Sequence, residues 1–213
     1  MSRIQCLLFD NDGTLVDSEW LCNRAIAILF RPLGVRLNTA YLVKHYRGGE
    51  LAKIFANLAE THQVTLSDDF IERYRAVVAE LFKRKLNPIS GIPEALEQLP
   101  QAKAVVSNGP LTKIQQALDL CGLSQYFNKN LFSAYDIGVF KPDPAIYLCS
   151  AQKMGFAPSQ CAVIEDSMAG IEAGVKAGMH VFFYNPHQEN CPFEQVYHFE
   201  NAAQLPSLIA KIR

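Results

Sequence analysis

Two aspartates separated by one residue stand directly after a short apolar run near the start of the chain. Ile4 and Cys6 to Phe9 lead into Asp10, Asn11, Asp12, Gly13 and Thr14. Such a run predicts a buried strand, and open α/β sheets bind ligands beyond the carboxyl ends of their strands. Two carboxylates at that position could bind a divalent cation, and they could act on an anionic ester as nucleophile and proton carrier.

An apolar run followed by polar residues recurs twice further along the chain. Residues 104–106 lead into Ser107 and Asn108, and residues 161–164 lead into Glu165 and Asp166. Helical stretches over 110–120 and 144–154 separate these runs, and a fourth apolar run covers 181–184. Strands that alternate with helices predict a parallel, doubly wound α/β sheet, so these polar groups should gather at one edge of it.

Helical periodicity fills residues 17–88, where no apolar run indicates a strand. The spacing predicts helices over 20–30, 51–59 and 70–82. We therefore predict an α/β core domain made of residues 1–16 and 89–213, and an inserted helical cap domain over 17–88. Pro88 and Pro93 mark one of the two connections, which favours a lid that moves over the polar edge of the sheet.

The composition argues against several classes of partner. Twenty Lys and Arg residues against 21 Asp and Glu residues leave no field that would attract nucleic acid or anionic lipid. No stretch approaches the roughly 20 apolar residues of a membrane span, and the amino terminus lacks the pattern of a secretion signal. We expect a cytoplasmic protein with no nucleic-acid or membrane partner. The sequence leaves the oligomeric state open, and a monomer is compatible with it.

The six cysteines contain no C-x-x-C pair. Cys6 and Cys161 lie inside apolar runs, so we interpret the cysteines as reduced thiols rather than as disulfides or zinc ligands. The five histidines also lack the spacing of a metal site.

Four motifs, in this order, resemble those of the haloacid dehalogenase superfamily of phosphotransferases, and the resemblance covers nearly the whole chain. They are the D-x-D-G-T sequence at 10–14, Ser107 after the second strand, Lys141 before Pro142, and the acidic pair Glu165 and Asp166. The helical insertion resembles the cap of the subgroup that contains β-phosphoglucomutase and many small-molecule phosphatases. The resemblance implies a Rossmann-like core and a Mg²⁺-dependent phosphatase.

The resemblance also implies a role for each aspartate of the motifs. Mg²⁺ would be bound by the carboxylates of Asp10 and Asp166 and by the backbone carbonyl of Asp12. Asp10 would be the nucleophile, forming an aspartyl phosphate that water then cleaves, and Asp12 would carry the protons. Because two carboxylates about 4 Å apart repel each other, we expect Asp12 to hold a proton near neutral pH.

The other motif residues suit a phosphate group. Ser107 can donate its hydroxyl to a phosphoryl oxygen, and backbone amides such as that of Asn108 can form an anion-binding nest. Lys141 supplies positive charge opposite the charge that develops on the phosphoryl group. Either Asp143 or Glu165 would hold the Lys141 ammonium, and Glu165 would otherwise act through a water on the metal.

These residues also have purely structural alternatives. A calcium-binding loop would need Gly at its sixth position and Glu at its twelfth, where this chain has Leu15 and Leu21. Asp12 could cap a helix, Ser107 could form a turn, and Lys141 could be a surface charge. Their joint occurrence at predicted strand ends favours the functional interpretation.

The cap must select the substrate, and a basic cluster is its clearest candidate. Lys44 and Arg47 precede Gly48 and Gly49 in what we interpret as a loop, where they could bind a carboxylate or a hydroxyl-rich tail. Residues 105–110 and 131–144 resemble bacterial phosphatases that act on 6-phosphogluconate. The expected substrate is a small phosphorylated metabolite, either a sugar phosphate or a sugar-acid phosphate. The alternatives are a phosphomutase, a metal-free dehalogenase and a non-catalytic metabolite-binding protein.

Overall fold

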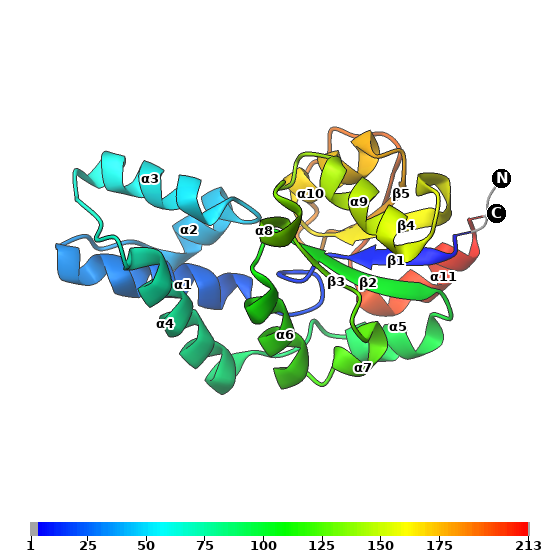
Figure 1. Ribbon diagram of the computed structural model, residues 1–213, viewed down its shortest axis with the longest axis horizontal. Helices are drawn as coiled ribbons and strands as arrows, with labels where there is room; N and C mark the ends of the chain where they lie inside the picture. Colours follow the sequence, from blue (N-terminus) through cyan, green and yellow to red (C-terminus); the bar gives the residue numbers. More distant parts are fainter. Residues whose placement is uncertain (1–3, 213) are drawn as a thin grey trace.

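The computed structural model describes residues 4–212 and contains a six-stranded parallel sheet (Figure 1). The strand order is β3-β2-β1-β4-β5-β6, so β1 lies between β2 and β4. The strands are β1 (Cys6–Phe9), β2 (Ala102–Ser107), β3 (Leu131–Ser133), β4 (Cys161–Glu165), β5 (His180–Tyr184) and β6 (Val196–Phe199). The parallel α/β fold predicted from the alternation of strands and helices is confirmed.

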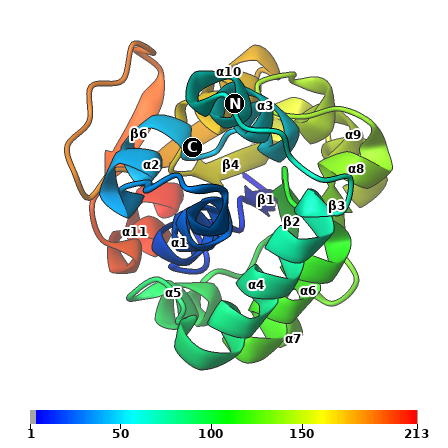
Figure 2. The same cartoon turned by 90° about the vertical axis from the view of Figure 1, so that its left-hand side faces the viewer.

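Alternate side chains of the strands join two separate apolar cores, one on each face of the sheet. Leu7 and Phe9 of β1 pack in one buried cluster, whereas Cys6 and Leu8 pack in the other. The first face is covered by α5 (Ile92–Gln98), α6 (Leu111–Leu120), α7 (Ser124–Phe127) and α11 (Leu205–Ala210). The second is covered by α8 (Ala134–Ile137), α9 (Ala145–Met154) and α10 (Met168–Lys176). Figure 2 shows the two groups of helices on either side of the sheet.

Four helices between β1 and α5 form a layer beyond the carboxyl ends of the strands (Figure 1). They are α1 (Glu19–Phe30), α2 (Thr39–Tyr46), α3 (Leu51–His62) and α4 (Phe70–Lys85), with a 3-10 turn at Arg31–Leu33. The ring of Phe55 lies edge-on to those of Phe70 and Tyr74, with centroids 5.1 and 5.4 Å apart. Aromatic packing thus holds this helical layer together. No helix within residues 4–212 is both long and apolar enough to cross a membrane.

The two chain segments that connect the sheet to the helical layer lie side by side. Val16 forms an antiparallel bridge with Pro88, and the amide of Asp17 donates to the carbonyl of Asn87 at 2.9 Å. This pairing lies where the sequence predicts the boundary of the inserted unit, at residues 17 and 88. The division into two domains and the motion of the cap remain predictions.

Several elements were not predicted from the sequence. β3 and β6 lack the continuous apolar run that marks β1, and the helices α2, α5, α7, α8 and α11 were also not predicted. The segment interpreted as a loop around Lys44 belongs in part to α2, which ends at Tyr46, and only the following residues up to α3 are irregular.

Candidate active site

Three neighbouring strands deliver the motif residues to one edge of the sheet. Phe9 is paired with both Val105 and Ile164, so the residues that follow these strands lie side by side. Asp10 is buried directly beyond β1, and its amide donates to the carbonyl of Ile164 at 2.9 Å. This register explains why motifs more than 150 residues apart form a single site.

Lys141 links the first and fourth motifs. Its buried Nζ lies 2.5 Å from Oδ1 of Asp10 and 2.7 Å from Oε1 of Glu165. Asp143 and Glu165 were the two candidates for holding this ammonium, and in the structure Glu165 holds it. Asp143 is exposed, and its Oδ1 accepts from the amide of Ala145 at the start of α9, so its expected contact with Lys141 is not formed.

Glu165 is fixed by hydrogen bonds on both carboxylate oxygens. Oε1 binds Lys141, while Oε2 accepts from the amides of Asp166 and Ser167 at 2.9 and 2.8 Å and from the Ser167 hydroxyl at 2.9 Å. Gly170 of α10 lies so close that a Cβ there would overlap the Glu165 carboxylate. The glycine allows α10 to begin directly over this side chain.

The carboxylates of Asp10, Glu165 and Asp166 form a buried cluster that fits a divalent cation. One oxygen of each lies within 4.8 Å of the others, and the cations that face them are Lys141 and Arg47. Burial and neighbouring carboxylates raise the pKa of Asp10 and of Asp166 well above the usual range. Their ionised forms are therefore disfavoured without a further cation, and hard oxygen donors suit Mg²⁺.

The cluster differs in one member from the predicted metal site of Asp10, Asp12 and Asp166. The third carboxylate of the cluster belongs to Glu165, whereas the side chain of Asp12 is paired with Lys113. The role predicted for Asp12 used its backbone carbonyl and remains a prediction. Close by, Thr14 Oγ1 donates to Asp166 Oδ1 at 2.9 Å, and a Cβ on Gly13 would overlap Asp166 Oδ2, so the motif loop packs directly on this carboxylate.

Asp12 is held by an ion pair that the sequence analysis did not foresee. Its Oδ1 lies 2.7 Å from Nζ of Lys113 and accepts from the Ser18 hydroxyl at 2.6 Å. Burial alone would raise the pKa of Asp12, but the Lys113 ammonium and the hydrogen bonds from Lys113 and Ser18 outweigh it and lower that pKa. The expectation that repulsion from Asp10 keeps Asp12 protonated near neutral pH is therefore corrected.

Ser107 is the last residue of β2, Asn108 follows it, and both line the site. Ser107 is buried, and its Oγ accepts from the amide of Gly109 at 3.0 Å, which leaves the hydroxyl proton available as a donor. The Asn108 side chain joins two loops, because its Oδ1 accepts from the amide of Lys141 at 2.9 Å and its Nδ2 donates to the carbonyl of Gly48 at 3.5 Å. Asn108 thus connects the sheet edge to the cap.

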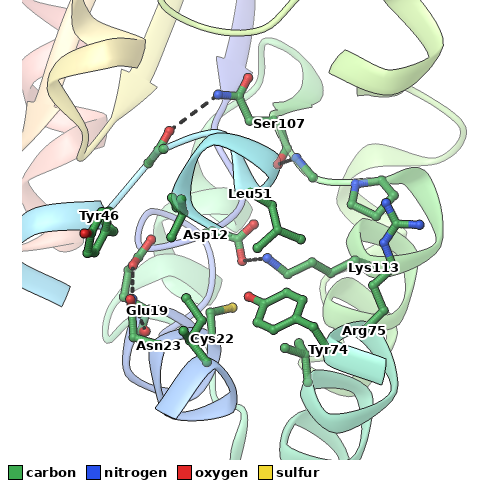
Figure 3. Close-up of a pocket in the computed structure, with 18 of the residues that line it drawn as sticks. Asp12, Glu19, Cys22, Asn23, Tyr46, Leu51, Tyr74, Arg75, Ser107 and Lys113 are labelled. Carbon is green, nitrogen blue, oxygen red and sulfur yellow. Dashed lines mark hydrogen bonds and ion pairs between the residues drawn. The ribbon is translucent and has the colours of Figure 1, made fainter. Parts of the chain in front are cut away.

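A cavity of about 350 Å³ lies between the sheet edge and the helical layer (Figure 3). Asp10, Asp12, Ser107, Asn108 and Lys141 line it from the core. The residues that line it from the cap include Glu19, Cys22, Asn23, Tyr46, Leu51, Tyr74 and Arg75. Asn23 Nδ2 donates to Glu19 Oε2 at 3.2 Å, and burial together with the charge of Asp12 raises the pKa of Glu19 to about 8.

The two cap residues predicted to select the substrate lie outside the set that lines this cavity. Lys44 is exposed on α2. The guanidinium of Arg47 turns to the core, where Nη2 lies 2.6 Å from Oε2 of Glu189 and Nε lies 3.7 Å from Oδ2 of Asp166. The role of Lys44 and Arg47 in specificity remains a prediction. Through its contacts with Asp166 and Glu189, Arg47 links the cap to the core.

Among the cavity residues that the sequence analysis did not single out are the titratable residues Glu19, Tyr74, Arg75 and Lys113. Lys113 stands in the first turn of a predicted helix, and Glu19 directly precedes another; both lie close to a motif, and that proximity was the available signal. Tyr74 and Arg75 lie within a long predicted helix. In such a helix, the periodicity distinguishes an apolar face from a polar face but does not identify the residues that pack against either face.

Comparison with known proteins places the chain in a family. A family model described as haloacid dehalogenase-like hydrolase matches residues 4–178. The chain belongs to this family. The four motif positions named above, from Asp10 to Asp166, all lie within the matched residues.

Individual members of the family are also similar to the chain. The 6-phosphogluconate phosphatase of Escherichia coli K12 is 39% identical over 98% of this chain and 96% of its own length. The fructose-1-phosphate phosphatase of the same organism is 27% identical, covering 83% of this chain and 94% of its own.

Solved structures of the family share the fold. A haloacid dehalogenase-like protein from Agrobacterium tumefaciens superimposes with a TM-score of 0.82 at 25% identity, over 97% of this chain and 98% of its own. A putative β-phosphoglucomutase from Thermotoga maritima has a TM-score of 0.76 at 21% identity, over 99% of this chain and all of its own. Both cover the cap as well as the sheet, so the helical layer is part of the shared architecture.

Proposed function

We propose that the protein is a Mg²⁺-dependent phosphatase of small phosphorylated sugars and sugar acids, with 6-phosphogluconate as the first substrate to test. The observation that carries the proposal is the buried group of Asp10, Lys141, Glu165 and Asp166 at the end of a cavity. The similarity over almost the full length to a 6-phosphogluconate phosphatase supports the substrate class.

Mg²⁺, when bound by Asp10 and Asp166 with the carbonyl of Asp12, would neutralise charge on the phosphate and on the attacking carboxylate. Glu165, whose two oxygens are occupied by protein donors, would keep Lys141 and the backbone around Asp166 in place. Lys141, the Ser107 hydroxyl and the loop amides, including that of Asn108, would bind the phosphoryl oxygens.

The residues of the chain account for two successive displacements at phosphorus. A carboxylate oxygen of Asp10 attacks the phosphorus, the bond from phosphorus to the ester oxygen breaks, and Asp12 gives its proton to the leaving alkoxide. A water then attacks the phosphorus of the aspartyl phosphate and gives a proton to Asp12. Inorganic phosphate leaves, and the carboxylate of Asp10 is regenerated.

For the first displacement Asp12 must be protonated, but its ion pair with Lys113 lowers its pKa and favours the ionised form. We infer that substrate changes this pairing, because a phosphate ester brings its own negative charge to the Lys113 side of the site. In the free protein Asp12 is ionised, and a charged partner for Lys113 that arrives with the substrate would raise the pKa of Asp12.

The size of the cavity favours small substrates. A volume of about 350 Å³ lies at the lower end of the range for small-molecule sites, so a single sugar phosphate fits better than a phosphoprotein loop. The fructose-1-phosphate phosphatase among the relatives acts on a substrate of the same size class. We also propose that the protein acts in the cytoplasm.

Phosphate release from a panel of sugar, sugar-acid and nucleotide monophosphates, with Mg²⁺ and with a chelator, tests the proposal. We expect release that needs Mg²⁺, is fastest with sugar-acid phosphates and is lost in Asp10→Asn. Asp136→Asn, at an exposed position of α8, is the matched control and should keep full activity. Isomerised sugar phosphate without free phosphate would show a mutase instead. Activity that survives the chelator would favour the dehalogenase alternative, and no turnover of any substrate would favour a binding protein.

A further inference from the structure

Three cationic side chains line the cavity, and two of them are neutralised by carboxylates. Lys141 is paired with Asp10 and Glu165, and Lys113 is paired with Asp12. Within residues 4–212, no carboxylate oxygen lies within 4 Å of the third, Arg75. The cavity therefore has one positive charge that no protein group neutralises.

Arg75 lies where the cap meets the core. It belongs to α4, and its guanidinium carbon is 5.3 Å from the ring centroid of Tyr135 on α8. Arg75 is exposed, and no residue of the described range 4–212 accepts a hydrogen bond from its guanidinium, so its N–H groups can bind a ligand. Figure 3 shows Arg75 on the same side of the cavity as Lys113, away from Glu19 and Tyr46.

The residue that supports Arg75 lies two strands away from the nucleophile. Tyr135 follows β3, and β3 is two strands away from β1, which ends at Phe9 directly before Asp10. Neighbouring strands are about 4.8 Å apart, so the ends of β3 and β1 are separated by roughly 10 Å. An acyclic six-carbon chain with a phosphate at one end and a carboxylate at the other is of this order of length.

The charges elsewhere in the cavity direct a substrate carboxylate toward the same place. Asp12 would repel it, whereas hydroxyl groups could pair with Glu19 and Asn23. Arg47 is already bound to Glu189 and Asp166, so its guanidinium has carboxylate partners. Arg75 remains as the cation with free donors, and its fork geometry matches a carboxylate.

We propose that Arg75 binds the carboxylate of a sugar-acid phosphate whose phosphate group lies at Asp10, Ser107 and Lys141. The inference rests on the proposed phosphatase function and adds the residue that distinguishes sugar acids from neutral sugar phosphates. Because Arg75 comes from the cap and Tyr135 from the core, a bound carboxylate would also join the two parts across the cavity.

A pair of substrates that differ in one group tests this role. 6-Phosphogluconate and glucitol 6-phosphate have the same carbon chain, but the first ends in a carboxylate and the second in a hydroxymethyl group. In Arg75→Gln we expect kcat/KM for 6-phosphogluconate to fall about 10- to 100-fold, since hydrogen bonds to charged groups are lost. The value for glucitol 6-phosphate should stay within about threefold of the wild type.

Two further variants separate recognition from structural damage. Arg73→Gln changes an exposed arginine of the same helix outside the cavity lining and should leave both substrates unaffected. Arg75→Lys keeps the charge and should restore part of the preference for the acid. The inference is overturned if Arg75→Gln slows both substrates equally, or if it slows neither. If the wild-type protein releases no phosphate from any ester, the proposed function itself fails, and this failure is visible before any variant is measured.

Discussion

The Nζ of Lys113 lies 2.7 Å from Oδ1 of Asp12, although the two residues are 101 positions apart in the chain. The same oxygen accepts from Ser18, the residue immediately before α1. The side chain expected to carry protons is therefore held between the first helix of the cap and a helix of the core. Any movement of the cap relative to α6 would change the surroundings of Asp12.

Lys113→Met should move the pH dependence of the phosphatase reaction. Lys113 lowers the pKa of Asp12, so its removal raises that pKa, and the protonated acid persists to higher pH. We expect the alkaline limb of kcat, which reports the enzyme–substrate complex, to shift upward, measured from pH 5 to 9 with a saturating metal concentration. Lys129→Met, an exposed change outside the cavity, is the control. An alkaline limb at the same pH in Lys113→Met and wild type would show that this ion pair does not tune Asp12.

Asp166→Asn should have opposite effects on stability and on metal binding. The pKa of Asp166 is higher in the folded protein than in the unfolded chain. The unfolded chain therefore loses this proton at a lower pH, and the stability of the fold decreases as pH rises through that range. At pH 7 with a chelator we expect the variant to be more stable than the wild type. Thermal unfolding with added Mg²⁺ should then show a rise in Tm for the wild type and little change for Asp166→Asn. A full Mg²⁺-dependent rise in the variant would exclude Asp166 as a ligand.

Glu19→Gln should stabilise the protein in a pH-dependent manner. The pKa of Glu19 is raised to about 8 in the folded state, chiefly by burial and then by the charge of Asp12. Between the ordinary carboxyl pKa and pH 8 the unfolded chain loses this proton while the folded protein keeps it, so wild-type stability falls as pH rises. The Tm advantage of Glu19→Gln should grow from pH 5 to 8 and then level off. A constant difference across this range would contradict the assignment.

Gly170→Ala should disturb the site through Glu165. The added Cβ would overlap the Glu165 carboxylate, which cannot move without breaking its bonds to Lys141 and to the amides after it. We expect a loss of about 3 kcal/mol or more in urea unfolding, together with loss of activity. Gly178→Ala, just beyond the other end of α10, has a positive φ and nothing within 4 Å of its Cβ, so it should cost only about 1–2 kcal/mol. Equal losses in the two variants would argue against the clash.

The sheet and the motif residues could be predicted because they depend on local patterns. Each apolar run ends in polar residues, and the parallel order of the strands forces those ends together, as the pairing of Phe9 with Val105 and Ile164 illustrates. β3 and β6 were missed because neither has a continuous apolar run like that of β1: β3 has only two apolar residues, and His198 interrupts β6. The alternation of strands and helices was enough to identify the fold without them.

The state of Asp12 and the cavity wall were not predictable from the same patterns. The ion pair with Lys113 depends on how α6 packs against the cap, and Arg75 meets Tyr135 across the boundary between cap and core. Helical periodicity indicates that α4 has a buried face but does not identify the side chains opposite it. The expectation for Asp12 was wrong because it considered only the repulsion from Asp10. Lys113, which is distant in the sequence, lies beside Asp12 in the fold and lowers its pKa.

Rapid-quench labelling of Asp10 tests the central claim most directly. The protein is mixed with Mg²⁺ and 6-phosphogluconate that carries ³²P, quenched in acid at successive times, and digested for peptide mapping. We predict label that appears before free phosphate reaches its steady rate, is removed by hydroxylamine, maps to the peptide with Asp10 and is absent in Asp10→Asn. Phosphate release by Asp10→Asn at the wild-type rate, or label confined to another residue, would contradict the account.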